Sequence, residues 1–362
     1  MRTSRSPAAS PRRVSPASRR PSPNSHASRR GGSAAARKSR RNRLAPTSPD
    51  TISASLPPPR PSPWLLAIVL TTTVLAVRAA RDGLKTESYR EADACKSSYL
   101  PTGALGAIRL LFSALIWSTI GCAICGHPIE LNLFYLSDSA MPGRHSGSLS
   151  FRLSGLARQS PFTGQSFVLL GVYFTLAGIA SLSGVCEWST SAGMLLTILI
   201  NVLYPTHLLI CNMVTWVLIP FGWFKKSHAG LRVFGIHTAL MAHNANIAMV
   251  SLELALSRQF ILPELAPFAI LYGIYFVIWS WVWALRHRIF YYFFLDVTLP
   301  AAKSVGLHFL LAVMLYFGSR LGVAVSGLHS YGFGTEMAIA ALVTFYSSRI
   351  RFPTSKWWPM SM

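Results

Sequence analysis

The sequence predicts an all-α protein: a polytopic transmembrane helical bundle of about seven or eight spans, with a disordered basic tail at its N-terminus. Three observations lead to this prediction: a series of apolar runs, a low content of charge, and a cluster of basic residues in the first 60 positions. Hydrophobic residues make up 51% of the 362 residues and charged residues only 13%. A soluble domain of this length carries more charge, so the composition favours a membrane protein.

The apolar runs begin near Trp64 and continue almost to the C-terminus. A helix needs about 20 residues to cross a bilayer, and only the first and last runs are clearly short of this. The runs are 63–79, 103–124, 164–186, 193–221, 233–256, 267–285, 301–323 and 335–347. They define a predicted transmembrane helical domain over 63–348, followed by a short C-terminal tail over 349–362.

Residues 1–62 have a different composition, rich in Arg, Ser and Pro. Of the 34 basic residues in the chain, 14 fall in the first 60 positions, where Asp50 is the only acid. Such a segment buries too little apolar surface to offset its ordering entropy, so we expect it to be disordered. It fits an arm on anionic lipid headgroups, a topology signal, or a transit peptide for an organellar membrane. Nucleic acid is not an expected partner, because no aromatic residue interleaves the arginines before Trp64.

The basic residues between the runs indicate the orientation, because cytosolic loops carry an excess of Lys and Arg. With the N-terminus in the cytosol, each of four cytosolic segments carries three basic residues. These are Arg144, Arg152 and Arg158; Lys225, Lys226 and Arg232; Arg286, Arg288 and Lys303; and Arg349, Arg351 and Lys356. We therefore expect both termini in the cytosol, in an integral protein of the endoplasmic reticulum or the plasma membrane.

The sequence lacks the motifs of the large cofactor and metal classes. Five cysteines are too few and too scattered for a disulfide framework or a zinc site. No nucleotide-binding glycine loop, HExxH or GxSxG motif occurs, so we expect no metal and no cofactor. Three intramembrane histidines, His207, His243 and His308, leave one alternative open, which is a bis-His haem site.

Polar residues are densest in the run 233–256, VFGIHTALMAHNANIAMVSLELAL. His243 lies about 10 residues from either end, and is therefore expected roughly 15 Å from each interface. Asn246 lies one turn further on the same face. In hydrocarbon such residues are costly and mark functional sites. A neutral imidazole could take a proton from a hydroxyl while the amide steadies an oxyanion; alternatively, both residues join helices by hydrogen bonds.

Asn244 and Glu253 are supporting candidates in the same run. Glu253 lies 10 positions after His243, about 15 Å further along the axis, so it is not a direct partner of that histidine. We expect its carboxylate to lie near the interface and to reach water. Arg109 and Arg320 are likewise expected near helix ends, with their charged groups extended towards water.

The segment SPFTGQSF, residues 160–167, precedes the third run. Thr163 is well placed to cap that helix through its hydroxyl. A hydroxyl nucleophile would need a base within hydrogen-bond reach, and an interfacial cap would lie at a different depth from a mid-bilayer His243.

The stretch HNANIAMVSLE from His243 to Glu253, the aromatic sixth run and its exit YYFFLD resemble the androgen-induced family of multi-pass membrane proteins. VTWVLIPFGWF, before the histidine run, is also similar to that family. The resemblance covers about 161–322. It implies an atypical threonine hydrolase that cleaves fatty acid esters of hydroxy fatty acids, with the family's histidine at His243 and its threonine at Thr163.

The resemblance thus implies an intramembrane hydrolase of lipid esters, a threonine-type enzyme whose substrate arrives from the bilayer. His243 would deprotonate Thr163, and Asn246 or a backbone N–H would steady the oxyanion. Two alternatives come from other classes: a haem-binding membrane electron carrier, and a non-enzymatic transporter or membrane-organising bundle. An internal repeat would favour transport, and none is evident.

Overall fold

The computed structural model describes residues 59–86, 94–132, 150–183, 190–220, 234, 236–287 and 290–348. All of them belong to one compact unit, Thr47–Met362. The prediction of an all-α polytopic bundle is confirmed, because seven helices in the described segments are long and apolar enough to cross a membrane. The predicted disordered tail, except residues 59–62, and the predicted C-terminal tail lie outside the described residues.

The described chain is almost entirely helical. Its helices are α2 (Pro63–Gly83), α4 (Thr102–Cys125), α5 (Phe162–Ser183), α6 (Thr190–Asn212), α9 (His237–Leu240), α10 (Asn246–Leu256), α11 (Ala266–His287), α12 (Ala301–Ser326) and α13 (Phe333–Ser347). A π-helical segment, Met213–Leu218, extends α6, and a π-helical turn, Met241–Ala245, joins α9 to α10. The strands β1 (Ile129–Asn132) and β2 (Ser150–Leu153) form an antiparallel ribbon.

The first apolar run forms a full-length helix and the last a short one. Helix α2 has 21 residues and continues past the predicted end at position 79. Its last turn carries the charged Arg81 and Asp82, and both are exposed. Ser62 caps its start by accepting a hydrogen bond from the Leu65 N–H at 3.2 Å. Helix α13 has 15 residues, about 22 Å at 1.5 Å per residue, which is short of the hydrocarbon thickness of about 30 Å.

The fifth span begins later than the hydropathy predicts. It runs from His237 to Leu256, because Ile236 is still extended, with φ −67° and ψ 141°. His243 therefore lies six residues from the start of the span, about 9 Å along the axis. The expected mid-bilayer depth of His243 is wrong, and the residue lies nearer the beginning of its helix.

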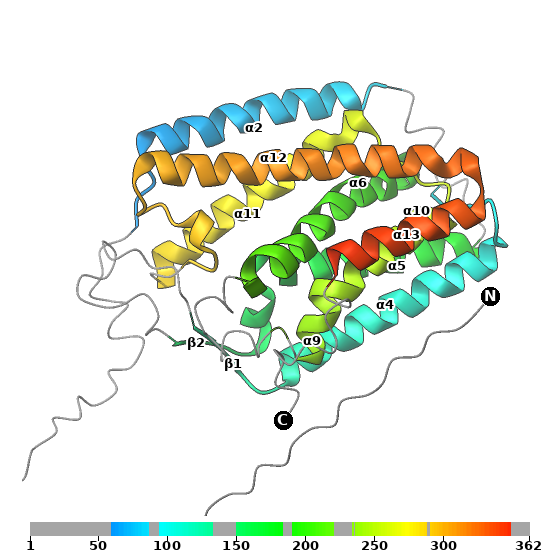
Figure 1. The fold of residues 1–362 in the computed structure, drawn as a ribbon, viewed down its shortest axis with the longest axis horizontal. Coiled ribbons are helices and arrows are strands. Elements are labelled where there is room, and N and C mark those ends of the chain that lie inside the picture. The colour runs from blue at the N-terminus through cyan, green and yellow to red at the C-terminus, as the bar shows by residue number, and fades with distance from the viewer. Residues whose placement is uncertain are drawn as a thin grey trace, which may run out of the picture. The chain divides into compact units, whose positions relative to one another are not determined.

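Helix α6 runs through the middle of the bundle, between α2, α11 and α12 on one side and α4, α5, α10 and α13 on the other (Figure 1). Its span, Ala192–Leu218, is the most buried of the seven, with 78% of its most apolar stretch inside the protein. The β1–β2 ribbon leads into the start of α5, and α9 contacts α4 close by. We call this end of the bundle the ribbon end.

Helices α4 and α5 pack closely through glycines. A Cβ at Gly178 would lie 2.7 Å from Leu110 Cδ2, and one at Gly106 would lie 2.8 Å from Leu182 Cγ. Small residues at such a seam allow two membrane helices to approach at backbone distance. The seam fixes α5, and with it the polar residues that α5 carries towards α6 and α10.

Candidate active site

Thr163 lies in the first turn of α5 and does not cap it. The Pro161 carbonyl accepts the hydrogen bond from the Gln165 N–H at 3.1 Å, so Pro161 holds the cap position and the expected capping role of Thr163 is wrong. The Thr163 side chain is 8% exposed. Its hydroxyl lies near the phenol of Tyr292, in the connection between α11 and α12.

Tyr292 belongs to an aromatic cluster that covers the start of α5. Its neighbour Tyr291 is hydrogen-bonded to the Ser160 hydroxyl, and the indole N–H of Trp279 donates to the Ser160 carbonyl at 3.2 Å. Burial raises the pKa of Tyr292, while hydrogen bonding to Thr163 acts in the opposite direction. The phenol is therefore a neutral O–H at physiological pH, next to the candidate nucleophile.

His243 lies on the π-helical turn at the ribbon end. Its Nδ1 is 2.7 Å from the Ala239 carbonyl oxygen, so in the neutral ring Nδ1 carries the proton and Nε2 is the basic nitrogen. The ring packs edge-on against Phe234, with centroids 5.5 Å apart. A π-helical turn is a frequent feature of functional sites because its extra residue redirects the side chains around it.

One contact and one shared neighbour relate the level of α10 to that of α5. The Tyr173 hydroxyl donates to Glu253 Oε1 at 2.8 Å across 80 positions of sequence. Ser166 and Asn246, also 80 apart, both adjoin His207: Asn246 through a hydrogen bond and Ser166 through its backbone. Thr163 and His243 differ by the same 80 positions.

The two helices begin at the same end of the bundle, so we infer from this shared offset that Thr163 and His243 lie at a similar level, to within about one residue for the π-helical turn. Among the described residues, however, the side chain that interacts with the Thr163 hydroxyl is Tyr292. No hydrogen bond between Thr163 and His243 is seen among the described residues.

Asn246 is fully buried, and its amide is used between helices. Its Nδ2 donates to the Ala242 carbonyl at 2.7 Å and lies 2.8 Å from His207 Nδ1, while the Cys211 thiol donates to its Oδ1 at 3.0 Å. Both amide hydrogens therefore have acceptors. In this arrangement the Asn246 amide has no hydrogen left to donate to an oxyanion, so its expected role as oxyanion donor would need the amide to change partners. Asn244, 6% exposed, donates to the Leu240 carbonyl of its own helix at 3.3 Å.

His207 completes this interhelical connection. Because its Nδ1 accepts from Asn246, its Nε2 carries the proton, which faces the backbone of Ser166. Nε2 is buried and has no hydrogen bond of good geometry within the described part of the chain. His207 thus lies between the π-helical turn of His243 and the first turns of α5.

Glu253 forms a buried ion pair instead of reaching water. It is 2% exposed and Arg109 is 0% exposed. Arg109 donates to Glu253 through Nε at 3.1 Å and through Nη2, and to Ser181 Oγ through Nη1 at 2.7 Å. The expected positions of both residues at the interface are wrong, because each charge finds its partner inside the bundle. Together with Tyr173, the pair ties α4, α5 and α10 together.

Two of the intramembrane histidines make hydrogen bonds of their own. His308 bonds its Nδ1 to the Ser304 carbonyl at 2.7 Å and packs against Trp281, whereas His207 bonds to Asn246. No group of three or more His, Cys, Asp or Glu side chains within reach of one metal ion occurs among these residues.

The sequence does not indicate the roles of three further residues of this region. Tyr292 lies in the exit YYFFLD, where the motif assigns no role to single residues. His207 and Arg109 are polar residues whose partners lie 39 and 144 positions away in the chain. Among known proteins, neither a family model, a curated sequence nor a solved structure matches this chain.

Proposed function

We propose that this protein is an intramembrane hydrolase of lipid esters, with Thr163 as nucleophile and His243 as general base. The observation that carries the proposal is the Tyr173–Glu253 contact at an 80-residue offset, from which we infer a common level for Thr163 and His243. The basic Nε2 of His243 and the neutral phenol of Tyr292 give this level a base and a hydrogen-bond donor. Fatty acid esters of hydroxy fatty acids are the substrate class that the family resemblance suggests.

In the proposed reaction, substrate binding exchanges the partner of the Thr163 hydroxyl from Tyr292 to His243. His243 Nε2 takes the proton, and the alkoxide attacks the ester carbonyl to form an acyl-threonine. The leaving alcohol takes the proton back from the imidazolium. A water molecule, activated by His243, then releases the acid. Tyr292, freed from Thr163, replaces Asn246 as the donor to the oxyanion.

Covalent labelling with a fluorophosphonate probe tests this function. The wild-type protein in lipid nanodiscs is expected to carry the label on the peptide containing Thr163. Thr163→Ala removes the nucleophile and His243→Ala removes the base, so both are expected to abolish labelling while the thermal unfolding midpoint is retained. Ser166→Ala, one turn further on α5, is the matched control and is expected to label normally. A label that persists in Thr163→Ala, or that maps to another peptide, contradicts the proposal.

Tyr292→Phe tests the oxyanion donor. The variant keeps the ring and its packing but loses the hydroxyl, so the rate of ester hydrolysis is expected to fall by about 10²- to 10³-fold. The measurement is kcat for a long-chain ester in nanodiscs. Tyr291→Phe is the control, because its hydroxyl bonds to Ser160 and not to Thr163. Equal rates for Tyr292→Phe and wild type would remove Tyr292 from the mechanism.

We also propose an orientation and a membrane for this protein. The seven apolar helices indicate an integral membrane protein in contact with lipid. From the distribution of Lys and Arg we propose a cytosolic N-terminus, in the endoplasmic reticulum or the plasma membrane, with the Arg-rich tail on anionic headgroups. An antibody against an N-terminal tag, applied after selective permeabilisation of the plasma membrane, tests the orientation.

A non-enzymatic membrane-organising bundle is the second candidate. The observation that favours it is that Asn246 and Glu253, both expected to support catalysis, form hydrogen bonds to other helices. The labelling experiment separates the two functions, because a protein that only organises helices takes up no fluorophosphonate at Thr163.

A further inference from the structure

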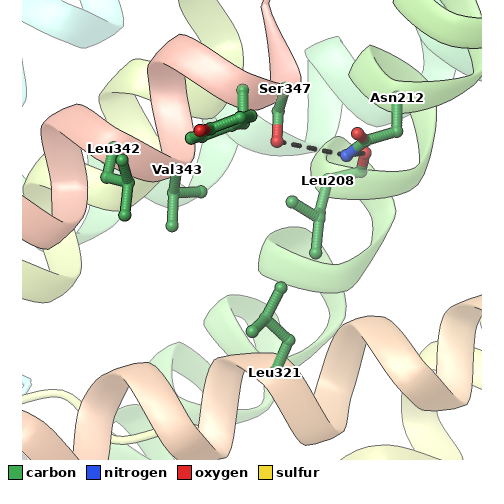
Figure 2. A pocket seen from close by; sticks show the side chains of 7 residues that line it. Leu208, Asn212, Leu321, Leu342, Val343 and Ser347 are labelled. Carbon is green, nitrogen blue, oxygen red and sulfur yellow. Dashed lines mark hydrogen bonds between the residues drawn. The ribbon is translucent and has the colours of Figure 1, made fainter.

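A groove opens between α6, α12 and α13 (Figure 2). Its volume is about 250 Å³, and its lining residues are Leu208, Asn212, Leu321, Leu342, Val343, Tyr346 and Ser347. None of them is charged. Small-molecule pockets usually hold about 300 to 1,000 Å³, so this groove suits a slender apolar group.

The groove is continuous with the lipid-facing surface of the bundle. Three of its lining residues are largely exposed: Leu321 by 46%, Leu342 by 55% and Tyr346 by 54%. The adjoining Phe317 on α12 and Phe345 on α13 are 66% and 50% exposed. Large side chains of this kind face hydrocarbon in a membrane-spanning helix, so the mouth of the groove opens to the acyl chains of the bilayer.

One end of the groove is polar. Asn212 Nδ2 donates to Ser347 Oγ at 3.1 Å and to the Leu208 carbonyl at 2.8 Å (Figure 2). Both amide hydrogens are thus used, which fixes the orientation of the amide. Ser347 Oγ accepts in this pair, so its own O–H is left to donate. The groove therefore offers the Ser347 hydroxyl as a donor at its polar end, beside the phenol of Tyr346, which also lines it.

We infer that this groove binds one acyl chain of a bilayer glycerolipid, with the ester carbonyl of that chain accepting a hydrogen bond from Ser347. The apolar walls and the absence of charge among the lining residues suit the chain, and the Ser347 hydroxyl beside Asn212 suits a carbonyl oxygen. Thr163 and His243 do not line the groove, so the inference is independent of hydrolase activity.

Photo-crosslinking tests the inference. The probe is a phosphatidylcholine with a diazirine on one acyl chain, used at low density in phosphatidylcholine nanodiscs. Crosslinks are expected on the α13 and α6 peptides that line the groove, at higher yield than on the exposed α12 surface around Phe309 and Leu310. Leu342→Trp fills the groove and is expected to lower its crosslinks at least fivefold. Leu310→Trp, equally exposed but outside the groove, is the matched control and leaves them unchanged.

Two further measurements keep the outcomes distinct. Val343→Phe fills the groove by a smaller change, and both filled variants are checked for an unaltered thermal unfolding midpoint. Equal crosslinking of the groove and of the open α12 surface, or no loss in either filled variant, means ordinary annular lipid and overturns the inference. The mass of the nanodisc gives the number of protein chains in it. A fall from two chains in the wild type to one in Leu342→Trp means that a second copy occupies the groove, which also overturns the inference.

Discussion

Replacing Arg109 with Met is expected to lower the free energy of unfolding by about 3–5 kcal/mol. The substitution leaves the carboxylate of Glu253 buried, at 2% exposure, without its cationic partner. Removing one member of a buried ion pair costs far more than the pair itself contributes, because the remaining charge keeps its desolvation penalty. Equilibrium unfolding in mixed micelles of dodecyl maltoside and sodium dodecyl sulfate measures the change.

Two controls isolate the buried charge from the loss of an arginine. Arg320→Met removes an exposed arginine of α12 and is expected to change the free energy of unfolding by less than about 0.5 kcal/mol. The double variant Arg109→Met, Glu253→Gln removes both charges and keeps an acceptor for Tyr173, so it should recover most of the loss. A double variant as unstable as Arg109→Met alone would show that packing, and not charge, explains the effect.

Replacing His207 with Leu is expected to affect both stability and activity. Asn246 Nδ2 loses a buried acceptor, which costs about 1–3 kcal/mol of unfolding free energy. The π-helical turn that carries His243 then loses its connection towards α5, and a displacement of about 1 Å is enough to lower the acylation rate of Thr163 by about 10²-fold. The rate of fluorophosphonate labelling measures the second effect.

His207→Asn is the conservative variant for the same position. Its Oδ1 replaces Nδ1 as acceptor for Asn246, so it should restore the labelling rate of Thr163 more than it restores stability. His308→Leu is the matched control, because His308 is also buried but bonds within its own helix. If His207→Leu lost stability while labelling at the wild-type rate, His207 would have no positioning role.

The sequence predicts the spans of this bundle well because hydrocarbon demands long apolar helices, and that demand is local. The limits of the prediction are at the helix ends. Run 63–79 stopped at charged residues that helix α2 carries on its exposed side, and run 233–256 began before the backbone turns helical at His237. The hydropathy of a residue reports its preference for lipid and contains little information on where the helical backbone begins.

The candidate site was predicted by residue type and not by partner. Thr163 and His243 were singled out, yet their common level follows from contacts made by other residues, Tyr173 with Glu253 and Asn246 with His207. Such pairs lie tens of positions apart, and no local pattern encodes them. For the same reason Glu253 was expected at the interface, because its partner Arg109 is on a helix three spans earlier.

The buried Arg109–Glu253 pair also bears on how the protein enters the membrane. Arg109 is made 144 residues before Glu253, which at ordinary rates of synthesis is a delay of about 7 to 30 s. During that interval helix α4 carries an arginine with no carboxylate to meet it, which raises the cost of inserting the helix. Helix α4 is apolar enough to insert despite this cost. We expect Arg109 to find its charge partner only when α10 has emerged, so that the Arg109–Glu253 pair forms late in assembly.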